Sequence, residues 1–133
     1  MADFGFIPNL IASADIYPFR FVTLSGAFTG AAAGAANKKI VGATDGSVSV
    51  FNGTYNATYD AVAQTGTTVN MQSTNTIQIE VGTGGCLAGS YLTSEAGGKA
   101  VIATTGQTSF YLALEAGAAG DIIRAFRNGP VVV

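Results

Sequence analysis

The sequence predicts an all-β protein: a small β-sandwich or barrel-like domain with an extended apolar N-terminal arm. Three observations support this prediction. Several short segments alternate apolar and polar residues, which is the period of a half-buried strand. Glycine-centred turns separate these segments, for example at 45–46, 97–98 and 117–120. The 133 residues are 48% hydrophobic but only 11% charged, which is typical of one domain with a core and a weakly charged surface.

The expected strands follow one another at short intervals. The clearest covers 76–81, where Ile77, Ile79 and Val81 share one face and Gln78 and Glu80 share the other. In chain order, the full set is expected at 17–24, 39–43, 47–51, 76–81, 100–104, 110–115 and 121–126. Turns are expected between them, including one at 128–129. Such spacing favours a sandwich or a barrel.

Three segments need separate treatment. We expect 29–37 to be a loop, because Gly30 and Gly34 weaken a helix by about 1 kcal/mol each relative to Ala. The segment 56–64 fits either a two-turn helix or a strand, and a strand is favoured. The β-prone end 130–133 would be an edge-pairing hazard if it were exposed. We therefore expect it to be paired, either within the domain or across a subunit boundary.

The first residues differ in kind from the rest, so we divide the chain into an arm at 1–12 and a single β-rich domain at 13–133. Gly5 and Pro8 interrupt the arm and make it a poor helix. Its apolar side chains are Phe4, Phe6, Ile7 and Leu10. They either strap onto their own domain or dock on another subunit, and the second interpretation makes these four the candidate partner-binding residues.

The composition argues against an enzyme and against a metal or cofactor site. The chain has no His and a single cysteine, Cys86, whereas catalysis near neutral pH and structural zinc depend on such residues. We expect Cys86 to be a small buried hydrophobe and Asp45, Glu95 and Asp121 to serve turns. The six Lys and Arg residues are scattered, so direct nucleic-acid binding is not expected. No apolar run suggests a membrane span or a signal peptide.

Two blocks of sequence carry a family resemblance. The first contains Arg20-Phe-Val22 and Leu24-Ser-Gly26, followed by Ile40-Val-Gly-Ala-Thr44. The second contains Gly97-Gly-Lys-Ala-Val101, then Ala113-Leu-Glu115 and Gly120-Asp-Ile122. In this order the blocks resemble the capsid decoration, or cement, proteins of tailed double-stranded DNA bacteriophages. The resemblance covers about half of the chain, and 47–84 match nothing in it.

The resemblance implies a structural virion protein on the outer surface of an icosahedral phage capsid, made in the host cytoplasm. It would bind the major capsid protein, bridge capsomers and stabilise the shell against internal DNA pressure. It also implies a homo-oligomer, with a trimer favoured. The alternative is a head-fibre or adhesin module that binds host surface glycans, for which Tyr55 and Tyr59, near Asn52 and Asn56, could stack on and hydrogen-bond a sugar.

Overall fold

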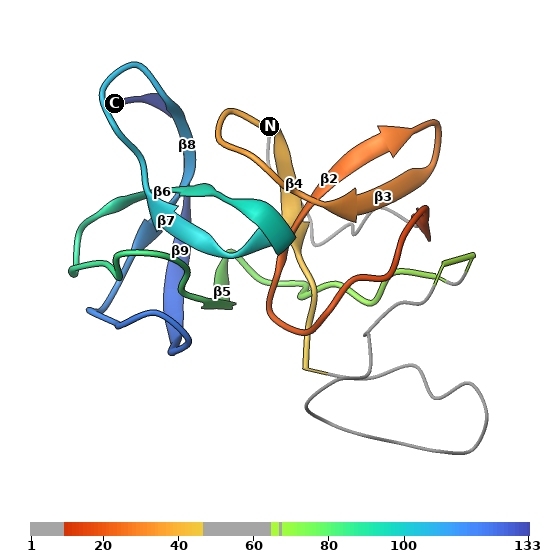
Figure 1. The fold of residues 1–133 in the computed structure, drawn as a ribbon, viewed down its shortest axis with the longest axis horizontal. Helices are drawn as coiled ribbons and strands as arrows, with labels where there is room; N and C mark the ends of the chain where they lie inside the picture. The colour runs from red at the N-terminus through yellow and green to blue at the C-terminus, as the bar shows by residue number, and fades with distance from the viewer. Residues whose placement is uncertain (1–9, 47–64, 67) are drawn as a thin grey trace.

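The computed structural model describes residues 10–46, 65–66 and 68–133, and the chain forms two β-sheets in a sandwich-like arrangement (Figure 1). The all-β prediction is therefore confirmed. The strand expected at 47–51 and the ambiguous segment 56–64 lie outside the described residues. Among the described residues, no helix is long and apolar enough to cross a membrane.

One sheet has four strands in the order β1-β3-β2-β4. Its strands are β1 (Ile11–Ala12), β2 (Phe21–Gly26), β3 (Thr29–Ala32) and β4 (Ile40–Ala43). β2 runs antiparallel to both β3 and β4, whereas β1 runs parallel to β3. Residues 11–12, assigned to the arm from the sequence, thus form an edge strand of this sheet.

The prediction of a loop over 29–37 is wrong for residues 29–32, which form β3. The glycine taken there as a breaker has a packing role instead. A Cβ placed on Gly30 would lie 3.1 Å from Leu10 Cδ1 and 3.3 Å from Val22 Cγ1. A small residue at this position lets β3 approach its neighbours closely.

The second sheet has five strands in the order β5-β9-β8-β6-β7, and all neighbours are antiparallel. Its strands are β5 (Thr76–Glu80), β6 (Tyr91–Ser94), β7 (Ala100–Ile102), β8 (Thr108–Ala113) and β9 (Ile122–Val132). The short 3-10 helix η1 (Ala96–Gly98) joins β6 to β7.

The C-terminal end is paired within the chain, since Val131 lies opposite Ser109 and Val132 opposite Thr108. The expected turn at 128–129 is absent, because β9 continues through it. A shift of register opposite β8 accommodates this stretch. Gly129 lies so close to β8 that an added Cβ would come within 2.8 Å of Phe110 Cα.

Among the described residues, most of the buried apolar side chains belong to two clusters. The larger lies between the sheets, where the rings of Phe21 and Tyr111 have centroids 5.3 Å apart. The smaller covers the other face of the four-stranded sheet and includes Val22, Val69 and Met71. Because Phe21 and Val22 are adjacent and point to opposite faces, the start of β2 is buried on both sides.

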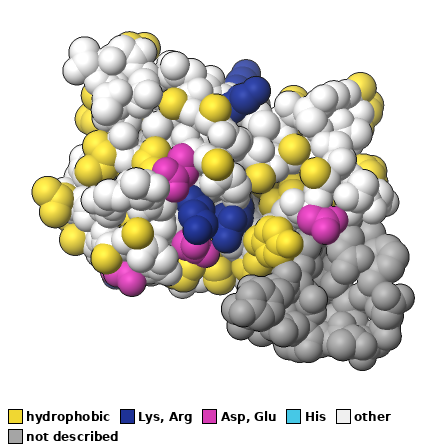
Figure 2. Space-filling model, in the orientation of Figure 1, with side chains coloured by type: hydrophobic (Ala, Val, Ile, Leu, Met, Phe, Trp, Pro, Cys, Tyr) yellow, Lys and Arg dark blue, Asp and Glu magenta, His cyan; other side chains and the backbone are white. Residues whose placement is uncertain are grey.

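Charged groups join the two sheets at their seam. Arg20, just before β2, donates a hydrogen bond from Nη1 to the Gly97 carbonyl oxygen at 3.0 Å. Its Nη2 lies 3.4 Å from Glu80 Oε1, and Lys99 Nζ lies 3.2 Å from Glu80 Oε2. Figure 2 shows basic and acidic side chains side by side near the middle of this face. Glu80 therefore holds two cations between the sheets.

Candidate interaction surfaces

The structure gives Leu10 a place in the core. Its side chain is 3% exposed and packs in the smaller cluster, and its carbonyl oxygen accepts a hydrogen bond from Val69 N–H at 2.9 Å. The other predicted docking residues, Phe4, Phe6 and Ile7, lie outside the described residues. Leu10 thus fixes the point where the chain joins the four-stranded sheet.

The tip of the β2–β3 hairpin presents an exposed aromatic ring. Phe28 is 79% exposed, and its backbone is left-handed, with a φ of 55°. The tip is nevertheless held in place, because Ile11 N–H donates to the Phe28 carbonyl oxygen at 2.9 Å. On the adjacent β2, Ser25 Oγ lies 3.2 Å from Thr29 Oγ1, and Leu24 is 53% exposed. The result is a fixed hairpin with an apolar end.

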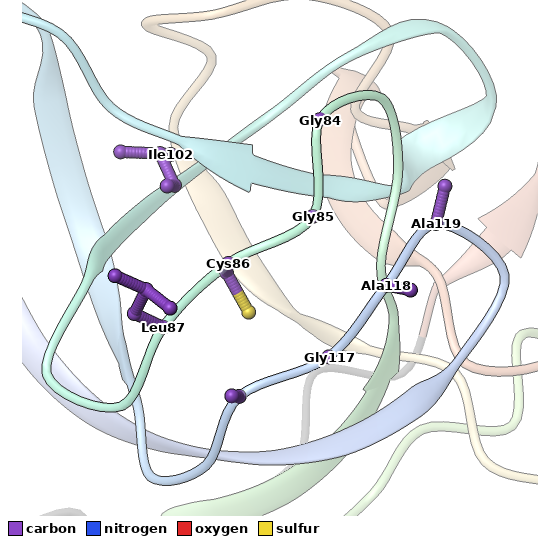
Figure 3. Close-up of a pocket in the computed structure, with 9 residues that line it drawn as sticks. Gly84, Gly85, Cys86, Leu87, Ile102, Gly117, Ala118 and Ala119 are labelled. Carbon is purple, nitrogen blue, oxygen red and sulfur yellow. The ribbon is translucent and has the colours of Figure 1, made fainter.

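A pocket of about 640 Å³ lies between the loops 84–87 and 116–119, with Ile102 of β7 beside them. Figure 3 shows Leu87 and Ile102 on one side and the glycine and alanine positions of the two loops around the rest. Cys86 and Gly117 tie the loops together: each N–H donates to the other's carbonyl oxygen, at 2.8 and 3.1 Å. The pocket is therefore apolar, open to solvent and framed largely by backbone.

Two carboxylates hold the turns around this pocket. Glu95 Oε2 accepts the Thr83 N–H at 3.0 Å, and Asp121 Oδ2 accepts the Ala118 N–H at 2.9 Å. The prediction that Glu95 and Asp121 serve turns is confirmed. Residues 83–84 form a turn, and Gly85, directly after it, has a φ of 69° that favours glycine.

Cys86 is a free, buried thiol at the base of one loop, as predicted. Its Sγ lies 3.8 Å from the Glu115 carbonyl oxygen. Burial raises the pKa of this thiol above its ordinary value, so it is protonated at neutral pH and a poor nucleophile. In the part of the chain that the structure describes, no group of three or more His, Cys, Asp or Glu residues could hold a metal ion.

The outer face of the five-stranded sheet carries a row of apolar side chains. Tyr91, Leu112 and Phe126 lie opposite one another on β6, β8 and β9. Tyr91 is 37% exposed and Phe126 43% exposed. Leu114, just beyond β8, is also exposed, and beside it the Arg124–Glu115 ion pair spans 3.0 Å. This face is a mixed apolar and polar surface rather than a continuous apolar patch.

Sequence reasoning found neither the Phe28 tip nor the pocket. The sequence Gly26-Ala-Phe28-Thr-Gly30 is typical of a loop, and this pattern does not indicate that the Phe28 side chain is exposed at a fixed tip. The pocket joins two turns about thirty residues apart, each of which is an ordinary glycine turn by itself. The sequence feature that could have indicated the Phe28 tip is an aromatic residue in a Gly/Ala-rich turn, because a large apolar side chain in such a turn is seldom buried.

Comparison with known proteins gives a structural match but no sequence match. No protein-family profile matches the sequence, and no curated protein matches it. Among solved structures, the chain is similar to the N base of the head fibre protein gp8.5 of bacteriophage phi29. That match has a TM-score of 0.58 and 21% sequence identity, and it covers 90% of this chain and 91% of that one. The likeness extends across the fold, including both sheets.

Proposed function

We propose that this protein is a structural, non-enzymatic component of the head of a tailed double-stranded DNA phage. In this role it binds the outer surface of the icosahedral capsid, bridges neighbouring capsomers and stabilises the shell against the pressure of packaged DNA. The observation that carries the proposal is the likeness to a phage head fibre base over 90% of the chain. The cement-like sequence blocks are a separate line of support for the same setting.

The mechanism is thermodynamic linkage. A protein that binds the assembled shell but not separated capsomers stabilises the shell by RT ln(1 + [L]/Kd) at each site. A contact that spans two capsomers must be broken when they part, so many modest contacts together oppose rupture. The partner in this proposal is the major capsid protein, and the acting form is a homo-oligomer, with a trimer favoured. No nucleic acid, membrane or cofactor takes part.

The docking residues in this proposal are those of the N-terminal arm. Burial of Phe4, Phe6 or Ile7 on a partner would contribute roughly 1.5–3 kcal/mol per side chain. Leu10 has a different part, because its side chain is already buried in the core. It anchors the arm to the domain and so fixes where the docking residues begin.

One observation favours a second function: the structural neighbour is itself part of a head fibre. In this alternative the chain is the base of a fibre or an adhesin that binds host surface glycans. Tyr55 and Tyr59, the sugar-stacking candidates, lie outside the described residues. Tyr91 and Phe126 on the outer sheet face offer a further pair of exposed rings.

The test is to mix the purified protein with undecorated, expanded capsids of its phage and to sediment them. We expect co-sedimentation at a saturable stoichiometry, together with better survival of the capsids after heating or osmotic shock. A variant without residues 2–9 should stay folded and lose binding, whereas Val132→Glu, a change at a position 70% exposed, should bind normally. Full decoration by the truncated protein would remove the arm from the proposal.

Two other results separate the alternatives. Binding to shells without any gain in survival would favour the fibre or adhesin function, which glycan arrays and host-cell binding would then examine. Absence of binding to shells would refute the decoration function.

A further inference from the structure

We propose that copies of this protein associate head to tail, with Phe28 of one copy inserted into the pocket between 84–87 and 116–119 of the next. The occupant of the pocket is thus a second copy of the same chain. This inference concerns the protein by itself and does not depend on capsid binding.

The β2–β3 tip has the properties of an inserting element. A left-handed backbone costs an L-residue roughly 1–2 kcal/mol, and such strain persists only where the surroundings impose it. Here the hydrogen bond from Ile11 N–H and the β2–β3 pairing fix the Phe28 backbone. Little conformational freedom is left to lose when the ring becomes buried, so the tip is pre-organised for binding.

The pocket has the properties of a receptor for an aromatic ring. A cavity of about 150 Å³ is enough to hold benzene, and this pocket is several times larger, at about 640 Å³. Leu87 and Ile102 are 69% and 43% exposed, so their apolar surfaces are available to a ring. The remaining walls are glycine and alanine positions, which leave room for the backbone of an entering hairpin.

The two features cannot meet within one molecule. Figure 1 shows the β2–β3 hairpin pointing to one end of the long axis, while the β5–β6 and β8–β9 loops lie at the other. Figure 2 shows apolar side chains at both of these ends. A contact between unlike surfaces of identical chains is heterologous, and it closes into a ring when the rotation between copies allows.

The absence of charge on both surfaces favours a second copy. Neither the hairpin residues 24–28 nor the residues lining the pocket include a charged side chain, so no charge would be buried. Insertion of the Phe28 ring of one copy into the pocket of the next therefore covers apolar surface on both sides and leaves every charged side chain in solvent.

Sedimentation equilibrium of the full chain tests the contact. We expect the native protein to self-associate and Phe28→Ala to raise the dissociation constant by about 10- to 100-fold, the equivalent of one buried aromatic side chain. Leu87→Glu, which places a charge at the pocket, should weaken association to a similar degree. The matched control is Val132→Glu, because Val132 is 70% exposed and Leu87 is 69% exposed; it should associate like the native chain.

A mixing experiment distinguishes this contact from other modes of association. The Phe28→Ala chain keeps its pocket and the Leu87→Glu chain keeps its Phe28 side chain. The mixture should therefore form a one-to-one heterodimer at concentrations at which each variant alone is largely monomeric. Circular dichroism should show both variants folded. A native chain that is monomeric at high micromolar concentration would overturn the proposal, as would unchanged association of Phe28→Ala or a mixture that does not pair.

Discussion

Replacing Leu10 with Ala tests a change in the role of this residue. The sequence predicts that Leu10 is a partner-binding residue of the arm, whereas the structure places its side chain in the core. The side chain is 3% exposed and packs in the cluster that covers the outer face of the four-stranded sheet. Leu→Ala substitutions in cores cost about 2–5 kcal/mol. Because Leu10 packs in the smaller of the two apolar clusters, we expect the low end of that range, about 2–3 kcal/mol.

The assay is urea unfolding followed by circular dichroism, together with thermal unfolding. For a chain of this length, a loss of about 2–3 kcal/mol corresponds to a melting temperature lower by roughly 6–12 °C. Ile11→Ala is the matched control, since Ile11 is the next residue and is 40% exposed; its cost should stay below about 1 kcal/mol. If Leu10→Ala unfolds like the native protein and yet loses capsid binding, Leu10 is a docking residue and the assignment to the core is wrong.

Three further predictions follow from named contacts. Glu80→Gln leaves two part-buried cations at the seam without a counter-charge, and we expect a loss of about 1–2 kcal/mol in urea unfolding that shrinks at high salt; no change would show that the ion pairs contribute nothing. The Arg124 backbone N–H, followed by its guanidinium, lowers the pKa of Glu115. The ionised Glu115 carboxylate therefore contributes stability above the unfolded pKa of the carboxyl, and this contribution is lost as the pH falls through the lower folded pKa. A carbon-detected NMR titration of Glu115 with an ordinary midpoint would contradict this. Gly85→Ala should destabilise more than Gly84→Ala, because both have positive φ but only the Cβ at Gly85 would lie 2.7 Å from the Gly117 carbonyl oxygen; equal melting temperatures would refute the steric argument.

Local alternation was enough to predict much of the fold. The pattern of Ile77, Ile79 and Val81 placed β5 correctly, because a strand with one buried face must repeat every second residue. The strands β4, β7 and β8 were also found, within a few residues at each end. β5 buries one face only, so its sequence alone carries the signal, whereas β8 buries Ser109, Phe110 and Tyr111 in succession.

The failures have a different physical origin, since glycine has two opposite uses. Gly30 and Gly129 look like breaks in the sequence, yet each lies inside a strand. An added Cβ would be tight at Gly30, 3.1 Å from Leu10 Cδ1, and too close at Gly129, 2.8 Å from Phe110 Cα. What separates a turn glycine from a packing glycine is the part of the chain that faces it. That part is the Leu10 side chain in the first case and the backbone of Ser109 and Phe110 in the second, and neither is close in sequence.

The candidate surfaces were harder to predict than the fold, because they depend on which apolar side chains remain exposed after the strands have packed. Phe28 is exposed because it lies at the tip of the β2–β3 hairpin, and the pocket lies where two turns meet. Under both proposals these surfaces and the arm act together. A closed assembly of several copies joined through Phe28 would present several N-terminal arms at once. After the first arm docked on a shell, the docking of the second and third would be intramolecular and would occur at a high effective concentration. Weak single contacts, which are what a chain with 11% charged residues and a short apolar arm can offer, would then add up to stable decoration of a shell.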